Sequence, residues 1–276
     1  MATNLKPQAK PTLESLGLKQ LIRPKERVNQ NISILIQGPV GSGKTWFAQT
    51  MPDPTFIMTD MNVGSLVDVV RDPFYVTSWE EWMDKYRPAI DNRLLPDKSL
   101  ILDTGGKLFT LLEQHIGKAR GAGSGPEGWG EWGRFKSLAQ QVVDHLTTSC
   151  IPTDNHPGYH VLMTMHEKTL TNEKGVITAI KPMMSSAFAD NIGASFDCYF
   201  TAEQKSTKLV TREPGKPAIV TRQPEEYILH TVRYDDYRDV KDGRGGRGGI
   251  HKLPKEVPND FPTVLKMWKD GATNGV

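Results

Sequence analysis

NISILIQGPVGSGKT, residues 31–45, is the stretch that decides the fold. Its first part, residues 31–37, is a short apolar run with three isoleucines, which is typical of a strand buried in a parallel sheet. The second part, residues 38–45, matches the pattern G-x-x-x-x-G-K-[ST] in full, and TWFAQTM (45–51) predicts a helix directly after it. A strand, a glycine loop and a helix in this order predict a P-loop that binds ATP with Mg²⁺.

Each residue type in the loop has an expected role. The glycines let backbone N–H groups approach the phosphates without a clashing Cβ, and the N-terminus of the helix adds a favourable dipole. We expect Lys44 to reach the β- and γ-phosphates and Thr45 to offer a hydroxyl to Mg²⁺. The residues predicted to bind the nucleotide are Gly38, Pro39, Val40, Gly41, Ser42, Gly43, Lys44 and Thr45.

Apolar runs alternate with helical patterns on the C-terminal side of the loop. Strands are predicted at 55–60, 99–103 and 159–167, and helices at 78–86, 108–116 and 135–146. This alternation predicts an α/β fold with a mostly parallel sheet flanked by helices. Shorter β-like runs at 176–180, 197–202 and 227–234 predict antiparallel strands added at one edge, and a closing helix is expected near 261–269. The glycine-rich stretch 121–130 is expected to be irregular.

Polar residues are expected where three of these strands end. SLILD (99–103) has the form of a Walker B strand, so Asp103 at its tip is the candidate Mg²⁺ ligand beside Thr45. Asp60 ends the strand after the P-loop helix; it either polarises the attacking water or is a solvated turn residue. His166 ends strand 159–167 together with Glu167; it either senses the γ-phosphate or is a loop histidine with no role.

Aromatic and basic residues gather around the glycine-rich stretch. Mobile backbone, aromatic rings and cations favour a loop that binds single-stranded DNA, because bases stack and phosphates pair. The alternative is a surface loop whose tryptophans fold back on the core. The candidate DNA-binding residues are Arg120, Trp129, Trp132, Arg134 and Lys136.

A second glycine-rich segment, VKDGRGGR (240–247), carries Arg244 and Lys241. An arginine on such a loop can complete the site of a neighbouring subunit as a finger. The alternative is a solvated basic loop. If Arg244 is a finger, the active form is an oligomer.

The composition is that of a globular protein. The chain has 276 residues, a hydrophobic fraction of 37% and a net charge of +2, so bulk charge alone does not favour nucleic acid. Residues 1–30 are expected to be a basic N-terminal extension and 31–276 a single domain. The N-terminus has no apolar signal core, and two cysteines outside any C-x-x-C pair do not favour a zinc site, so we expect a cytoplasmic protein.

The combination resembles the phage-encoded, core-only RecA-like ATPases, which act as single-strand annealing or recombination proteins. The resemblance spans most of residues 31–270; it rests on the P-loop, MPDPTFIMTD (51–60), LILDT (100–104), WGEWGRF (129–135), TMHE (164–167) and KDGRG (241–245). It implies a RecA-like core, ATP hydrolysis, single-stranded DNA as a partner, a homo-oligomeric ring or filament, and a single-strand DNA-binding protein as a further partner. RecA-like proteins carry a catalytic glutamate where this chain has the shorter Asp60.

Two other functions fit the same motifs. One is an ATP-dependent assembly switch that contacts only protein, which predicts no response to DNA. The other is a helicase-like motor or loader subunit, which predicts strand displacement.

Overall fold

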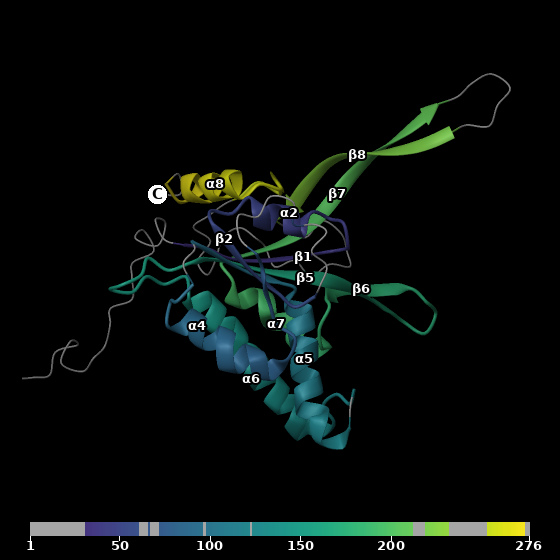
Figure 1. The fold of residues 1–276 in the computed structure, drawn as a ribbon. Helices are drawn as coiled ribbons and strands as arrows, with labels where there is room; N and C mark the ends of the chain where they lie inside the picture. The colour runs from purple at the N-terminus through teal and green to yellow at the C-terminus, as the bar shows by residue number, and fades with distance from the viewer. Residues whose placement is uncertain are drawn as a thin grey trace, which may run out of the picture.

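A computed structural model describes residues 31–60, 66, 72–95, 98–121, 123–211, 219–231 and 253–273 (Figure 1). The strands are β1 (Ser33–Gly38), β2 (Pro54–Met58), β3 (Phe74–Tyr75), β4 (Ser99–Asp103), β5 (His160–Thr171), β6 (Ile177–Pro182), β7 (Cys198–Thr211), β8 (Ile219–His230) and β9 (Glu256–Pro258). The α-helices are α2 (Lys44–Gln49), α3 (Trp79–Glu81), α4 (Arg87–Asp91), α5 (Gly105–Gly117), α6 (Gly128–Thr148), α7 (Ser186–Ile192) and α8 (Phe261–Thr273). A π-helical turn, Trp82–Tyr86, joins α3 to α4, and 3-10 turns, Lys118–Arg120 and Gly193–Ser195, follow α5 and α7.

The described strands form a nine-stranded sheet in the order β3-β2-β4-β5-β1-β7-β8-β9, with β6 paired to β5. The strands from β3 to β7 along this order are parallel, whereas β8, β9 and β6 pair antiparallel with their neighbours. The P-loop strand β1 therefore lies between β5 and β7, and β5 separates it from the acid-bearing strand β4. This arrangement confirms the predicted α/β fold, a mostly parallel sheet with added antiparallel strands.

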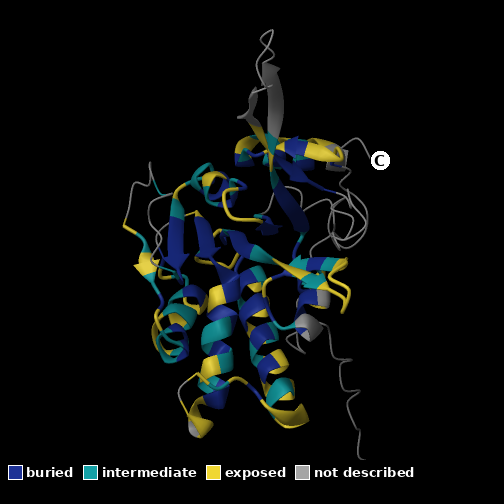
Figure 2. Cartoon of the chain, turned by 90° about the vertical axis from the view of Figure 1, so that its right-hand side faces the viewer, coloured by how far each residue is buried: buried dark blue, intermediate teal, exposed yellow. Residues whose placement is uncertain are grey.

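Helices cover both faces of the sheet, as Figure 1 shows for α2 and α8 on one side and α4 to α7 on the other. Strand β1 is buried throughout, and its side chains alternate between the two layers. Ile34 and Ile36 pack in the cluster that includes Phe47 of α2, while Leu35 packs in the cluster that includes Phe109 of α5. The apolar run before the P-loop thus anchors the loop to both cores (Figure 2).

No described helix has the length and apolar composition that crossing a membrane requires.

Two predicted strands are longer in the structure because each finds an antiparallel partner. The strand predicted at 159–167 continues to Thr171, since residues 167–171 pair with β6. The strand predicted at 197–202 continues to Thr211, since it forms a long hairpin with β8 that projects beyond the sheet (Figure 1). His166 and Glu167 therefore lie within β5, where it leaves the parallel sheet, rather than at its end.

The prediction that residues 121–130 are irregular is wrong at its C-terminal end, because α6 begins at Gly128. The rings of Trp132 and Phe135 pack edge to face at 5.7 Å, and Phe135 is buried in the core. Burial of this side chain stabilises the first turns of α6 in spite of their glycines.

The predicted basic extension, residues 1–30, lies outside the described residues. The helix predicted at 78–86 begins with a side-chain cap, since Ser78 Oγ accepts from Glu81 N at 3.1 Å, and its helical path runs on to Asp91. Strand β2 ends at Met58, so Asp60 follows the strand after one further residue instead of ending it.

Candidate nucleotide-binding site

The P-loop joins β1 to α2 by a turn that requires glycine at two positions. Gly41 and Gly43 have φ values of 80° and 86°, in the left-handed region that residues with a Cβ rarely adopt. Gly43 also has no room for a side chain, because a Cβ there would lie 2.5 Å from Asn259 Nδ2 and 2.8 Å from Tyr227 Cδ1. The turn in the predicted nucleotide-binding stretch 38–45 therefore depends on these two glycines.

Lys44 directs its ammonium group toward the loop itself. Its Nζ donates to Gly38 O at 2.8 Å and to Pro39 O at 2.7 Å. Burial lowers the pKa of Lys44 to about 8, although the Asp103 and Glu167 carboxylates raise it. A phosphate beside the ammonium group would favour the charged form, so phosphate binding and protonation of Lys44 are coupled.

Asp103 connects the P-loop to the neighbouring strands through both carboxylate oxygens. Thr45 Oγ1 donates to Oδ2 at 2.9 Å, and Thr164 Oγ1 donates to Oδ1 at 2.5 Å. Burial raises the pKa of Asp103, while the two hydroxyl donors lower it. A hydroxyl and a carboxylate in contact are oxygen donors of the kind that Mg²⁺ prefers, so Thr45 and Asp103 fit the predicted metal.

Asp60 lies near the same carboxylate. Besides burial, the negative charge of Asp60 raises the pKa of Asp103. The preceding residue, Thr59, fixes the backbone here: its Oγ1 donates to Thr104 O at 2.7 Å and accepts from Thr104 N at 3.0 Å. The structure thus brings the half-buried Asp60 to the edge of the site.

His166 lies opposite Gly38 in the parallel register of β5 and β1. Burial and the charge of Lys44 lower the pKa of His166, while the Asp103 and Asp60 carboxylates raise it. Within the described part of the chain, its buried Nδ1 has no hydrogen-bond partner. A neutral imidazole with a buried ring nitrogen at this place is suited to a hydrogen bond with a bound phosphate.

The candidate DNA-binding residues lie on helical segments rather than on a loop. Arg120 ends the 3-10 turn after α5, and the other four lie on the first turns of α6. Figure 1 shows this end of α5 and α6 pointing away from the sheet, on the face opposite α2. The structure therefore groups these five residues with one another but not with the P-loop.

Structural partners occupy two of the five. Arg120 Nη1 pairs with Glu131 Oε1 at 2.5 Å, and half-buried Trp132 packs against the core. Trp129 is 96% exposed, and Arg134 and Lys136 are also exposed. The exposed part of the candidate DNA surface is thus Trp129, Arg134 and Lys136.

The candidate finger Arg244 and its neighbour Lys241 lie outside the described residues, and their role stays a prediction.

Sequence reasoning missed two contacts of the site. Thr164 donates to Asp103, and its position two residues before His166, on the same face of β5, is the signal that would have found it. Asn259, which precedes α8, donates from Nδ2 to Gly43 O at 2.9 Å. No local pattern indicates this second contact, because the two residues are far apart in the chain.

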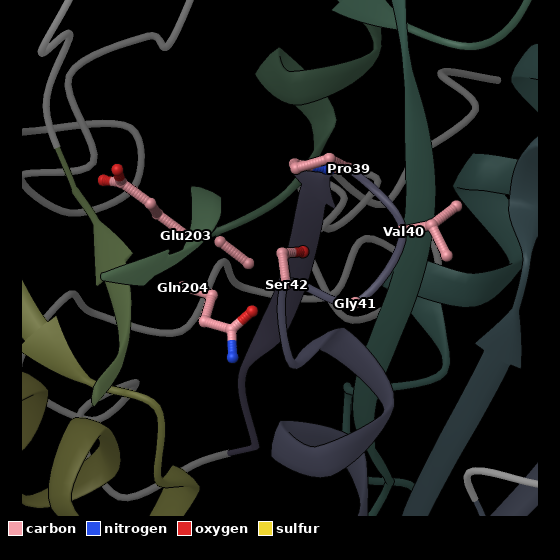
Figure 3. Close-up of a pocket in the computed structure, with 7 residues that line it drawn as sticks. Pro39, Val40, Gly41, Ser42, Glu203 and Gln204 are labelled. Atoms are coloured by element: carbon pink, nitrogen blue, oxygen red, sulfur yellow. The ribbon is translucent and has the colours of Figure 1, made fainter. Parts of the chain in front are cut away.

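A hollow of about 360 Å³ lies beside the P-loop, on the side of β7 (Figure 3). Figure 3 shows Gln204 with its carboxamide on the Ser42 side, while the Glu203 carboxylate points away from the loop. The hollow is lined by Pro39, Val40, Gly41, Ser42, Ala202, Glu203 and Gln204.

The chain was compared with families, curated proteins and solved structures, and the family match agrees with a P-loop ATPase. A sequence model of the family described as "AAA domain" matches residues 30–233. Among solved structures, the chain is similar to the flagellar accessory protein FlaH from Methanocaldococcus jannaschii, with 11% identity and a TM-score of 0.31 over 79% of this chain and 92% of that one. The comparison with curated proteins gave no significant match.

Proposed function

The chain belongs to the AAA domain family, and from this premise we propose that it hydrolyses ATP with Mg²⁺ and couples hydrolysis to single-stranded DNA. The family itself supports nucleotide binding and hydrolysis. The observation that carries the Mg²⁺ requirement is the 2.9 Å contact between the P-loop hydroxyl of Thr45 and the buried carboxylate of Asp103.

Each residue around this contact has a separate proposed role in hydrolysis. Lys44 binds the β- and γ-phosphates, and Asp60 orients and polarises the attacking water. His166 donates a hydrogen bond to the terminal phosphate and so distinguishes ATP from ADP. Mg²⁺, held by Thr45 and Asp103, would neutralise phosphate charge.

The test is ATP hydrolysis by the purified full-length protein, with Mg²⁺ or with excess EDTA. We expect hydrolysis only with Mg²⁺, and a loss of at least about 100-fold in Lys44→Ala and Asp103→Asn, because both remove charge from the phosphate site. Lys98→Ala is the matched control, since the Lys98 side chain forms an exposed ion pair with Asp53. Full activity in EDTA or in Lys44→Ala would contradict the proposal.

The proposed DNA partner rests on the exposed surface at the start of α6. Trp129 offers a fully accessible ring, and Arg134 and Lys136 add two cations within two turns of it. An aromatic ring stacks on bases of any sequence, and cations pair with the phosphates. By the resemblance to RecA-like annealing proteins, we propose annealing or homologous recombination as the role, with a single-strand DNA-binding protein as a further partner.

The DNA proposal is tested by binding to an oligothymidylate at several salt concentrations. The variant Trp129→Ala/Arg134→Ala/Lys136→Ala is expected to bind at least about tenfold more weakly, with a salt slope smaller by about 1.4 because each lost phosphate contact contributes about 0.7. Lys85→Ala, an exposed lysine of the Trp82–Tyr86 turn, is the control.

Three other outcomes separate the alternatives. Unchanged DNA binding in the triple variant would exclude the α6 surface. ATP hydrolysis that does not respond to DNA, with a nucleotide-dependent oligomeric state, would favour the assembly switch. Displacement of a paired strand would favour the helicase-like motor.

The proposed active form is a homo-oligomer, a ring or a filament, in which Arg244 of one subunit completes the P-loop of the next. Arg244 would neutralise charge that develops on the transferred phosphate. Because hydrolysis would then need two subunits, DNA-driven assembly would itself stimulate hydrolysis.

A further inference from the structure

The order of the strands indicates on which side of β1 the phosphates and the nucleoside of a bound nucleotide lie. Asp103 on β4 and His166 on β5 lie on one side of the P-loop strand β1, and β7 and β8 lie on the other. If the terminal phosphate lies at Asp103 and His166, as the proposed function requires, the nucleoside extends toward β7 and β8. Open α/β sheets bind ligands in this way, at the carboxyl ends of their strands.

The hollow beside the P-loop lies on that side of β1. Its volume of about 360 Å³ is within the range of small-molecule sites. Pro39 and Ala202 give it apolar atoms, Ser42 gives it a hydroxyl on the side of the P-loop, and Gln204 gives it a carboxamide on the side of β7 (Figure 3). Apolar atoms beside hydroxyl, carboxamide and backbone groups suit a nucleoside, because its base and ribose carry both kinds of surface.

Tyr227 of β8 borders this region with an aromatic ring. Its hydroxyl accepts from Gln204 Nε2 at 3.2 Å, and its ring lies against Gly43, where a Cβ would meet Tyr227 Cδ1 at 2.8 Å. The ring is nevertheless 39% exposed, although most aromatic rings around the sheet are buried. The backbone behind it is held by β9 and by Asn259 N, which donates to Tyr227 O at 3.3 Å.

The Glu203 carboxylate contacts a histidine rather than the P-loop. Its Oε2 lies 2.5 Å from Nε2 of buried His230, and its carboxylate points away from the P-loop (Figure 3). Gln204 therefore provides the side-chain polar group that faces the P-loop from β7 (Figure 3).

We propose that the hollow between the P-loop and β7 holds the nucleoside half of the bound nucleoside triphosphate, with the base stacked on the Tyr227 ring and its edge at the Gln204 carboxamide. This inference rests on the proposed function, because it takes the phosphate positions from it. It adds the part of the site that distinguishes a nucleotide from a bare polyphosphate.

The test compares two ligands that differ by the nucleoside. Binding of ATP and of inorganic tripolyphosphate, each with Mg²⁺, is measured by calorimetry on the full chain. Tyr227→Ala should raise the Kd for ATP about tenfold, because stacking on an aromatic ring is lost, and change the Kd for tripolyphosphate by less than about twofold. Tyr227→Phe, which keeps the ring, should bind ATP like the original protein.

Phe74→Ala is the matched control, since Phe74 is an exposed aromatic residue of the far edge strand β3. Retained tripolyphosphate binding shows that Tyr227→Ala leaves the P-loop folded. Equal weakening of both ligands would overturn the inference and assign Tyr227 to support of Gly43. Unchanged ATP binding would place the base elsewhere. If the original protein binds tripolyphosphate and ATP equally well, no base site exists; if it binds neither, the proposed function itself fails.

Discussion

At the scale of single residues, the protonation state of Lys44 is coupled to phosphate binding in the P-loop. Its ammonium group donates to the carbonyls of Gly38 and Pro39, and burial lowers its pKa to about 8. The protonated form is the one that binds phosphate. Below pH 8 this form is already present; above pH 8 binding must be accompanied by uptake of a proton.

We therefore predict that the affinity for ATP falls as the pH rises through 8. Between pH 7.5 and pH 9 the Kd should increase by about tenfold, since each pH unit above the pKa lowers the protonated fraction of Lys44 about tenfold. The control is Lys44→Arg, whose guanidinium stays charged throughout this range, so its Kd should change little. Equal pH dependence in both proteins would assign the effect to another group.

The proximity of Thr45 and Asp103 was predictable because their motifs combine fixed spacing with a strand or helix that positions them. The contacts of Arg120 and Trp132 were not. Arg120 pairs with Glu131, and Trp132 packs on Phe135, and both contacts depend on where α6 begins. A local pattern of aromatic and basic residues does not reveal which of these side chains form ion pairs or pack against the core in the folded chain.

At the scale of elements, β5 contributes two residues to the candidate site. It lies between the P-loop strand and the acid-bearing strand, and it presents Thr164 to Asp103 and His166 to the P-loop side. Both residues lie on the same face because side chains alternate along a strand.

Thr164→Val tests this contribution. The change keeps the shape but leaves a buried Asp103 oxygen without its donor, which should lower ATP hydrolysis about tenfold and the free energy of unfolding by about 1–3 kcal/mol. Thr164→Ser, which keeps the hydroxyl, should retain both properties. Hydrolysis rates and thermal unfolding check the two effects, and normal activity in Thr164→Val would show that Asp103 needs no support from β5.

The existence of most described strands and of the major helices was predictable from apolar periodicity, but the short edge strands β3 and β9 and several strand lengths were not. Apolar runs end where burial ends, at residues 167 and 202, whereas β5 and β7 continue as long as an antiparallel partner supplies backbone hydrogen bonds. The positions of β6 and β8 beside them are properties of the folded chain, which a pattern read one segment at a time does not contain.

At the scale of the whole molecule, the candidate nucleotide site and the candidate DNA surface lie on different faces. The P-loop is at the carboxyl ends of the central strands, while the start of α6 points away from the sheet (Figure 1). Coupling between the two surfaces therefore passes through the core or through contacts between subunits.

A mixing experiment tests the route between subunits. Lys44→Ala and Arg244→Ala proteins should each be inactive, but a mixture in equal amounts should recover about a quarter of the original hydrolysis rate, because some interfaces then combine an intact P-loop with an intact finger. Mixing either variant with Lys44→Ala/Arg244→Ala protein is the control. No recovery in the first mixture would show that Arg244 does not act across a subunit interface.

The continuity of β5 also decides how the molecule bears force. Up to Met163 the strand lies between two parallel neighbours, and up to His166 it still pairs with β1, so a pull along it loads many backbone hydrogen bonds at once, in shear. From Glu167 to Thr171 it belongs to a hairpin with β6, whose residue pairs separate one after another when the two strands are pulled apart. A pull on the tip of this hairpin would therefore peel it open first and stop at His166, where the parallel sheet begins to resist beside the P-loop.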